Sequence, residues 1–215
     1  MKARFELVCF DVDSTLVTIE GIDVLADGDP EVALLTSSAM NGEIPIDAVY
    51  GRRLERIRPT LGAVEALGMR YIDSLVPGAL EVIAALRSAH ADVHLVSAGV
   101  RQAILPLATH LGIEPRAVHA VELKFAPDGS WVDFDRRTPL TRPGGKELVV
   151  LNLRARSHGR AAFVGDGISD LETREAVDLF IGFGGVAERE AVARDAEIYV
   201  REPSLTALLP HLLEE

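Results

Sequence analysis

Short, continuous runs of apolar residues recur along the chain, and each run leads into small or polar residues. The first run covers residues 5–10, and three later runs have the same form. An apolar run without alternation is typical of a strand that is covered on both faces, as in a parallel sheet. The pattern therefore predicts strands at residues 5–10, 92–99, 159–167 and 178–185.

Helical spacing of apolar residues separates these strands. It occurs in residues 78–90, 145–157 and 187–195, and residues 202–215 predict a closing helix. Asp-Gly at residues 128–129 stands between two apolar runs and predicts a hairpin. Strands that alternate with helices predict an α/β fold with a parallel sheet, in which ligands bind beyond the carboxyl ends of the strands.

Residues 17–75 interrupt the alternation of strands and helices. They contain helix signals instead, with an N-cap and first helical residue at 29–30 and a helix over residues 46–58. A segment of this length exceeds an ordinary loop. We therefore expect an α/β core made of residues 1–16 and 76–215, with the interrupting segment inserted as a small helical cap.

Composition restricts the class of protein. The chain has 215 residues, of which 48% are hydrophobic and 26% charged, as in ordinary soluble proteins. The formal charge of −11 opposes binding to nucleic acid, and no apolar window is long enough for a membrane span. The start of the chain is charged too early for a secretory signal, and the single cysteine, Cys9, forms no internal disulfide. We expect a cytoplasmic protein with no nucleic-acid or membrane partner.

Two carboxylates, Asp11 and Asp13, follow the first predicted strand. Side chains two apart in a strand share a face, and close carboxylates repel unless a cation offsets their charge. Mg²⁺ prefers oxygen ligands and is the simplest such cation. Asp11 can attack phosphorus to form an aspartyl phosphate, while Asp13 moves the proton of the leaving group and of water. The alternative is that these residues only cap a helix.

Residues 10–15, FDVDST, resemble the first motif of the haloacid dehalogenase (HAD) superfamily, DxDx[T/S]. A further resemblance, to the phosphoserine phosphatase family, covers nearly the whole chain. It implies a HAD-like Rossmannoid core with a parallel sheet and catalytic loops at the strand ends. It also implies Mg²⁺-dependent hydrolysis of O-phospho-L-serine to L-serine and phosphate through an aspartyl phosphate, a reaction of serine biosynthesis.

Ser97, Ala98 and Gly99 lie at the end of the strand predicted at residues 92–99. A hydroxyl and consecutive backbone N–H groups at such a position can hold phosphate oxygens; the alternative is that Ser97 only caps the next helix. The family usually has Ser-Gly-Gly-Phe here, so Ala98 and Val100 depart from its pattern. Ala98 would strain the loop if that position required a positive φ.

The last two motifs surround Lys146 and Asp166. Lys146 follows two glycines and can neutralise a phosphate, or it can be an ordinary surface lysine. Asp166 fits a metal ligand. Asp170 fits a role in orienting a metal-bound water or Lys146, or a favourable charge at a helix N-terminus, and Ser169 can touch phosphate. The resemblance implies three metal ligands, namely the Asp11 side chain, the Asp13 backbone carbonyl and the Asp166 side chain.

Four residues of the predicted cap match the substrate-binding pattern of the family: Glu20, Met40, Asn41 and Arg53. The resemblance implies that Glu20 binds the substrate ammonium. Arg53 can pair with the substrate carboxylate through two parallel hydrogen bonds. Each residue also has an ordinary structural interpretation. Glu20 can be a favourable charge in the first turn of a helix, Met40 can pack in the core, and Arg53 can belong to a solvated, arginine-rich helix face.

Three alternative functions stay open at this level. The same phosphoenzyme can pass its phosphoryl group to homoserine, or the enzyme can hydrolyse another small phosphomonoester. A domain that binds phosphoproteins without catalysis is the third alternative, although binding alone does not require an acid–base aspartate beside a nucleophile. The sequence does not determine the oligomeric state or the preference for L over D substrate.

Overall fold

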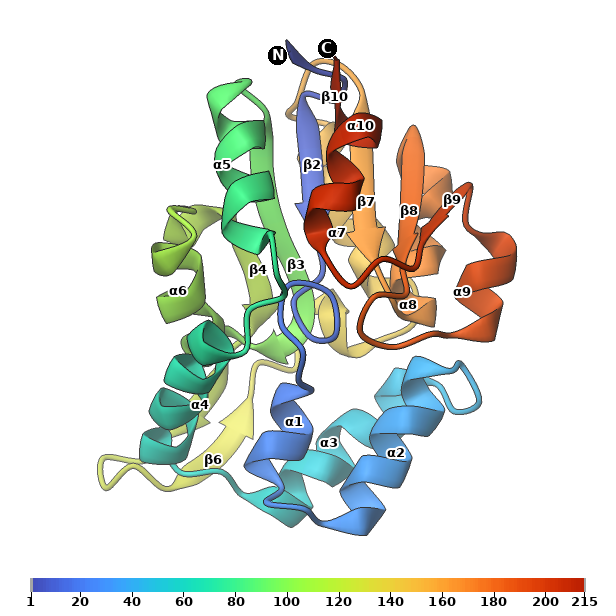
Figure 1. The fold of residues 1–215 in the computed structure, drawn as a ribbon. Helices are drawn as coiled ribbons and strands as arrows, with labels where there is room; N and C mark the ends of the chain where they lie inside the picture. Colours follow the sequence, from blue (N-terminus) through green and yellow to red (C-terminus); the bar gives the residue numbers. More distant parts are fainter. Residues whose placement is uncertain (1, 215) are drawn as a thin grey trace.

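A six-stranded parallel sheet forms the centre of the protein in a computed structural model that describes residues 2–214 (Figure 1). The strand order is β4-β3-β2-β7-β8-β9, and each neighbouring pair is parallel. These strands are β2 (Leu7–Phe10), β3 (Asp92–Val100), β4 (Val118–Val121), β7 (Ala161–Gly165), β8 (Leu179–Phe183) and β9 (Ile198–Val200). The α/β fold with a parallel sheet, predicted from the sequence, is confirmed.

Helices cover both faces of the sheet. In Figure 1, α5 and α10 lie in front of the sheet and α7 lies behind it. The central strands β2 and β7 are buried along their whole length, which explains their continuous apolar sequences. The helices of this part of the chain are α5 (Ala79–Ser88), α6 (Arg101–His110), α7 (Gly145–Arg154), α8 (Ile168–Leu171), α9 (Glu190–Asp195) and α10 (Leu209–Leu212).

The C-terminal residues do not form the single closing helix that the sequence predicts. A 3₁₀ turn over Leu205–Leu208 leads into the one-turn α10, and β10 (Leu213–Glu214) follows at once. Pro210 lies in the first turn of α10, where its missing N–H costs nothing, so the helix restarts there instead of continuing from upstream. β10 pairs antiparallel with β1 (Lys2–Ala3), which brings the two ends of the chain together.

Four helices follow the strand β2 before the chain returns to the sheet. They are α1 (Gly21–Leu25), α2 (Pro30–Met40), α3 (Ile46–Ile57) and α4 (Leu61–Asp73). The helix α2 starts as expected, because the Asp29 side chain accepts from the Glu31 N–H and Pro30 occupies the first turn. In Figure 1, α1, α2 and α3 lie beyond the carboxyl ends of the strands, whereas α4 lies closer to α6. The division of the chain into a core and a specificity cap stays a prediction.

The hairpin predicted around Asp128-Gly129 is present as β5 (Leu123–Phe125) and β6 (Trp131–Phe134). Gly129 adopts a φ of +82°, a value that favours glycine. The hairpin lies against the inserted helices, since the Leu61 N–H donates to the Gly129 carbonyl at 2.9 Å. The Phe134 ring meets the Tyr50 ring of α3 edge to face, with centroids 5.2 Å apart. Among residues 2–214, no helix is long and apolar enough to cross a membrane.

Candidate active site

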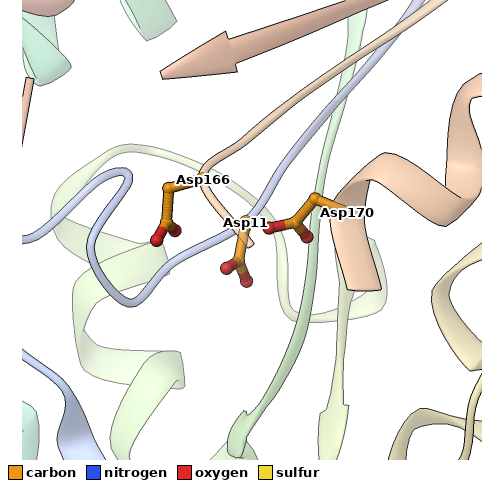
Figure 2. A group of neighbouring side chains, drawn as sticks. All are labelled: Asp11, Asp166 and Asp170. Atoms are coloured by element: carbon orange, nitrogen blue, oxygen red, sulfur yellow. The ribbon is translucent and has the colours of Figure 1, made fainter. Parts of the chain in front are cut away.

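Three buried carboxylates from different parts of the chain meet at the carboxyl end of the sheet (Figure 2). Asp11 follows β2, Asp166 follows β7 and Asp170 lies on α8. The parallel pairing of β2 with β7 places the first two together, and the Asp11 N–H donates to the Val164 carbonyl at 2.9 Å. One oxygen of each carboxylate lies within 4.8 Å of the others. In Figure 2, Asp11 lies between Asp166 and Asp170.

Lys146, at the start of α7, provides positive charge on one side of this cluster. Its Nζ lies 2.8 Å from Asp11 Oδ1 and 2.6 Å from Asp170 Oδ1. Asp170 Oδ2 accepts from the Gly167 N–H at 2.9 Å, so both oxygens of Asp170 are engaged. Burial alone would lower the pKa of the Lys146 ammonium, but the Asp11 and Asp170 carboxylates outweigh this effect and raise it. Lys146 is therefore a buried, permanently charged ammonium whose position is set by Asp170.

The residues around Asp11 fit a hard divalent cation. Burial and the negative charge of Asp11 raise the pKa of Asp166 to about 6 and that of Asp170 to about 8. These shifts mean that the cluster takes up protons unless further positive charge is present. Asp11 Oδ1 is buried and lies 2.8 Å from Lys146 Nζ, but the angle of this contact is too poor for a hydrogen bond, and no other group among residues 2–214 donates one to it. An oxygen-only donor set of this kind suits Mg²⁺ better than a softer metal.

Asp13 lies beside the cluster with its two oxygens in different surroundings. Its Oδ1 accepts from the Gly21 N–H at 2.7 Å and from the Tyr71 hydroxyl at 2.8 Å. Burial and the neighbouring charge of Asp11 raise the pKa of Asp13 to about 7. A carboxyl with such a pKa can both give and accept a proton near neutral pH. Tyr71 could not be predicted as a site residue, because nothing in its local sequence distinguishes it from an ordinary core residue.

The carboxyl end of β3, Ser97–Gly99, forms another wall of the site. Ser97 Oγ accepts from the Gly99 N–H at 3.0 Å, and the Ala98 carbonyl accepts from the Tyr50 hydroxyl at 2.9 Å. Ala98 does not have a positive φ, so replacing the usual glycine causes no backbone strain there. A Cβ added at Gly99 would lie 2.8 Å from Asp13 Oδ2 and 3.1 Å from Ser97 Oγ. Glycine at this position therefore lets the acid–base carboxylate lie close to the end of β3.

A cavity of about 260 Å³ joins this catalytic end of the sheet to the inserted helices. Most of the residues singled out from the sequence line it: Asp11, Asp13, Glu20, Met40, Arg53, Ser97, Ala98, Gly99, Lys146 and Ser169. Asp166, Asp170 and Asn41 are not among the lining residues. Asn41 instead accepts a hydrogen bond from Arg189 Nη1, at 3.4 Å, outside the cavity.

Arg53 and Glu20 bring opposite charges to the same cavity. Arg53 is only 6% exposed; its Nη1 donates to Thr36 Oγ1 at 3.2 Å, and its Nε has no acceptor among residues 2–214. Burial lowers the pKa of the Arg53 guanidinium. Glu20 Oε1 accepts from the Ser14 hydroxyl at 2.6 Å, and burial together with Asp13 raises the pKa of Glu20 well above its usual value. A ligand with both an ammonium and a carboxylate complements this pair.

Arg189, between β8 and α9, is a site residue that the sequence analysis missed. Its Nε donates to Asp166 Oδ2 at 2.9 Å, and its Nη2 lies 3.6 Å from Glu20 Oε1. The side chain is 12% exposed, although its neighbours Glu188 and Glu190 make the stretch read as solvated charge. No local pattern could have identified it, because its partners come from the start of the chain and from the end of β7.

Known proteins resemble this chain in sequence and in fold. The model of the haloacid dehalogenase-like hydrolase family matches residues 8–175. The chloroplastic phosphoserine phosphatase of Arabidopsis thaliana is 41% identical over 198 residues, which cover 89% of this chain and 67% of that protein. The phosphoserine phosphatase of Bos taurus is 36% identical over 201 residues, covering 92% and 89% of the two chains. A solved structure described as a phospho-aspartyl intermediate analogue of phosphoserine phosphatase has the same fold, with a TM-score of 0.83, 24% identity and coverage of 99% and 100%.

Proposed function

Since the chain belongs to the haloacid dehalogenase-like hydrolases, and to the phosphoserine phosphatases among them, we propose that it hydrolyses O-phospho-L-serine to L-serine and phosphate with Mg²⁺ as its cofactor. One observation carries the proposal. A single cavity of about 260 Å³ is lined both by the groups needed for phosphoryl transfer, Asp11, Asp13 and Lys146, and by the oppositely charged pair Glu20 and Arg53. The first set suits a phosphate ester and the second suits a zwitterionic amino acid.

In the proposed reaction, a carboxylate oxygen of Asp11 attacks phosphorus while the bond from phosphorus to the serine oxygen breaks. Asp13 gives its proton to the leaving serine oxygen, so that the products of this step are serine and an aspartyl phosphate on Asp11. Asp13 then accepts a proton from water, and the water oxygen attacks the phosphorus of the intermediate. Phosphate leaves, Asp11 is regenerated, and Asp13 carries its proton again. The pKa of Asp13, raised to about 7, supports this double role.

The Asp11 side chain, the Asp13 backbone carbonyl and the Asp166 side chain would hold the Mg²⁺ ion. When bound, the ion supplies positive charge that offsets the repulsion between the Asp11 carboxylate and the phosphate. Lys146 Nζ lies 2.8 Å from Asp11 Oδ1 and remains charged, so it stabilises the phosphate oxygens as well. Asp170 keeps the Lys146 ammonium in this position through its 2.6 Å contact.

In this proposal, the inserted helices recognise the serine part of the substrate. Arg53 binds the substrate carboxylate through its free guanidinium nitrogens, and Glu20 binds the ammonium. Met40 packs on the serine carbons, while Ser169 and residues Ser97–Gly99 at the end of β3 donate to phosphate oxygens. The predicted contact between Asn41 and the substrate lacks support from the cavity, because Asn41 does not line it.

We also place the reaction in the cytoplasm. Support comes from the single cysteine, Cys9, which is free and buried in the strand β2 and therefore needs no oxidising compartment. Fractionation of the source cells with an antibody against the protein would test this location.

Phosphate release from O-phospho-L-serine tests the function directly. We expect turnover with Mg²⁺, loss of turnover when a chelator removes the metal, and no turnover by Asp11→Asn, which should keep the fold. Absence of phosphate release from phosphoserine, with release from another ester in a screen of phosphorylated metabolites, would overturn the substrate assignment. Adding homoserine separates hydrolysis from phosphoryl transfer to an alcohol, because a transferase would form phosphohomoserine and release less phosphate.

A further inference from the structure

The hydrogen bonds of Asp13 distinguish its two oxygens. Oδ1 accepts from the Gly21 N–H at 2.7 Å and from the Tyr71 hydroxyl at 2.8 Å. A carboxyl oxygen has two lone pairs, so these two donors occupy the whole acceptor capacity of Oδ1. The other oxygen, Oδ2, lies at the cavity wall beside Gly99, since a Cβ added there would be 2.8 Å from it. A proton on the Asp13 carboxyl must therefore sit on Oδ2.

Tyr71 acts from outside the cavity. It lies on α4, has no exposed surface and is not among the residues that line the cavity, so it cannot contact a substrate there. Its helix is fixed in the core, where Gly68 of α4 packs against Pro106 and Ala103 of α6. The chain just after α4 is tied to the segment that follows Asp13, because the Val76 N–H donates to the Leu16 carbonyl at 2.9 Å.

Gly21 gives the Tyr71 hydroxyl room to reach Asp13. A Cβ added at Gly21 would collide with the Tyr71 hydroxyl and would lie 3.2 Å from Asp13 Oδ1. Gly21 is at the first position of α1 and does not have a positive φ. Glycine is therefore needed here for the space that a side chain would fill, and not for an unusual backbone conformation. The two donors to Oδ1 are therefore packed against each other, and a larger residue at position 21 would separate them.

We propose that Tyr71 is a positioning residue that holds the Asp13 carboxyl so that Oδ2, the oxygen able to carry the proton, faces the leaving group. The inference rests on the proposed function, in which Asp13 protonates the serine oxygen. Without the tyrosine hydroxyl, a lone pair of Oδ1 becomes free, the carboxyl can rotate, and the proton can sit on the oxygen that faces away from the cavity. Transfer of the proton to a poor leaving group then becomes less frequent.

Tyr71→Phe tests this role with two substrates that need the acid to different degrees. Serine leaves as an alkoxide that requires protonation, whereas nitrophenolate from p-nitrophenyl phosphate leaves without it. We expect kcat/KM for phosphoserine to fall about tenfold, the low end for a hydrogen bond to a charged group because Gly21 still donates, and kcat/KM for p-nitrophenyl phosphate to change far less. This ratio includes only the steps up to formation of the aspartyl phosphate, so the later role of Asp13 as a base does not affect it.

Two reference variants define the comparison. Tyr199→Phe removes the hydroxyl of another tyrosine, one that has no hydrogen-bond partner among residues 2–214, and should behave like the wild type with both substrates. Asp13→Asn should show the same selectivity as Tyr71→Phe but a larger loss. If Tyr71→Phe unfolds in a thermal melt, Gly21→Ala is the second test. It displaces the hydroxyl while keeping the tyrosine ring, and should give the same selective loss.

The outcomes separate this inference from the proposed function. Failure of the wild type to hydrolyse phosphoserine would overturn the function. A wild type and an Asp13→Asn variant that behave as expected, combined with a folded Tyr71→Phe variant that matches the wild type, would overturn the positioning role. An equal loss on both substrates by Tyr71→Phe would also overturn it, since general damage to the site does not depend on the leaving group.

Discussion

Replacing Arg53 with methionine should separate recognition of the substrate carboxylate from phosphoryl transfer. Arg53 is 6% exposed on α3, and its Nε has no acceptor among the residues that the structure describes. Methionine keeps a long apolar stem in the same space but has neither charge nor donors. The change therefore removes the proposed partner of the carboxylate and leaves Asp11, Asp13 and Lys146 in place.

The size of the effect follows from the burial of this charge. Removing one partner of a buried, hydrogen-bonded charge pair costs about 2–5 kcal/mol. We take about 3 kcal/mol for Arg53, because Asp23 and Glu20 lie close enough to share its charge in the free enzyme. This corresponds to a fall of about 150-fold in kcat/KM for phosphoserine. Phosphoethanolamine has the phosphate and ammonium without the carboxylate, so its kcat/KM should change by less than about threefold.

The assay is phosphate release from both substrates by the wild type, by Arg53→Met and by a matched control, Arg52→Met. Arg52 is the neighbouring arginine on the same helix and is exposed, so its replacement should leave both rates unchanged. Thermal unfolding without substrate should show no loss of stability in Arg53→Met, because burying the Arg53 charge with no acceptor for its Nε is costly to the free protein. Equal losses on the two substrates, or a similar loss in Arg52→Met, would refute the carboxylate clamp.

Three further predictions address other parts of the site and fold. Glu20→Gln should lower kcat/KM for phosphoserine at least about tenfold but leave kcat/KM for 3-phosphoglycerate, which has no ammonium, unchanged. An equal fall in kcat/KM for both substrates would exclude the ammonium contact. Arg189→Gln removes positive charge 2.9 Å from Asp166, so calorimetry should find Mg²⁺ bound about three- to tenfold more tightly, whereas weaker binding would make Arg189 a support for Asp166. Burial and His94 lower the pKa of His119 to about 4, so its neutral form stabilises the fold fully above about pH 6.5 and this contribution is lost as the pH falls towards 4. Between pH 7 and pH 5, the free energy of unfolding measured in urea should therefore fall by about 1 kcal/mol less in His119→Asn than in the wild type. An identical fall in the two proteins would contradict the shifted pKa.

Elements with strong local signals could be predicted from the sequence. The buried strand β2 follows from its continuous apolar run, and the start of α2 follows from Asp29 and Pro30. The turn between β5 and β6 could be predicted because it requires a positive φ at residue 129, which is +82°, and glycine adopts such a φ readily. In each case, the physical cause lies within a few neighbouring residues, so the local sequence is sufficient.

Features that depend on distant contacts could not be predicted. The two-residue strand β10 exists only because Leu213 pairs with Ala3 at the other end of the chain. Arg189 joins the site through Asp166 and Glu20, and Tyr71 reaches Asp13 from a helix that is separated from it by three others. Asp11, Lys146 and Asp166 were identifiable because each follows a strand or opens a helix, whereas residues that support them through the core carry no such mark.

Locating the phosphoryl group during turnover tests the central claim most directly. The enzyme is mixed with phosphoserine and Mg²⁺, quenched in acid within one turnover and digested, and the peptides are analysed by mass spectrometry. The proposed mechanism predicts one phosphoryl group on the peptide that contains Asp11, located on Asp11 itself. It predicts none in Asp11→Asn. Rapid release of phosphate from phosphoserine with no phosphoryl group on Asp11, or with the group on another residue, would contradict it.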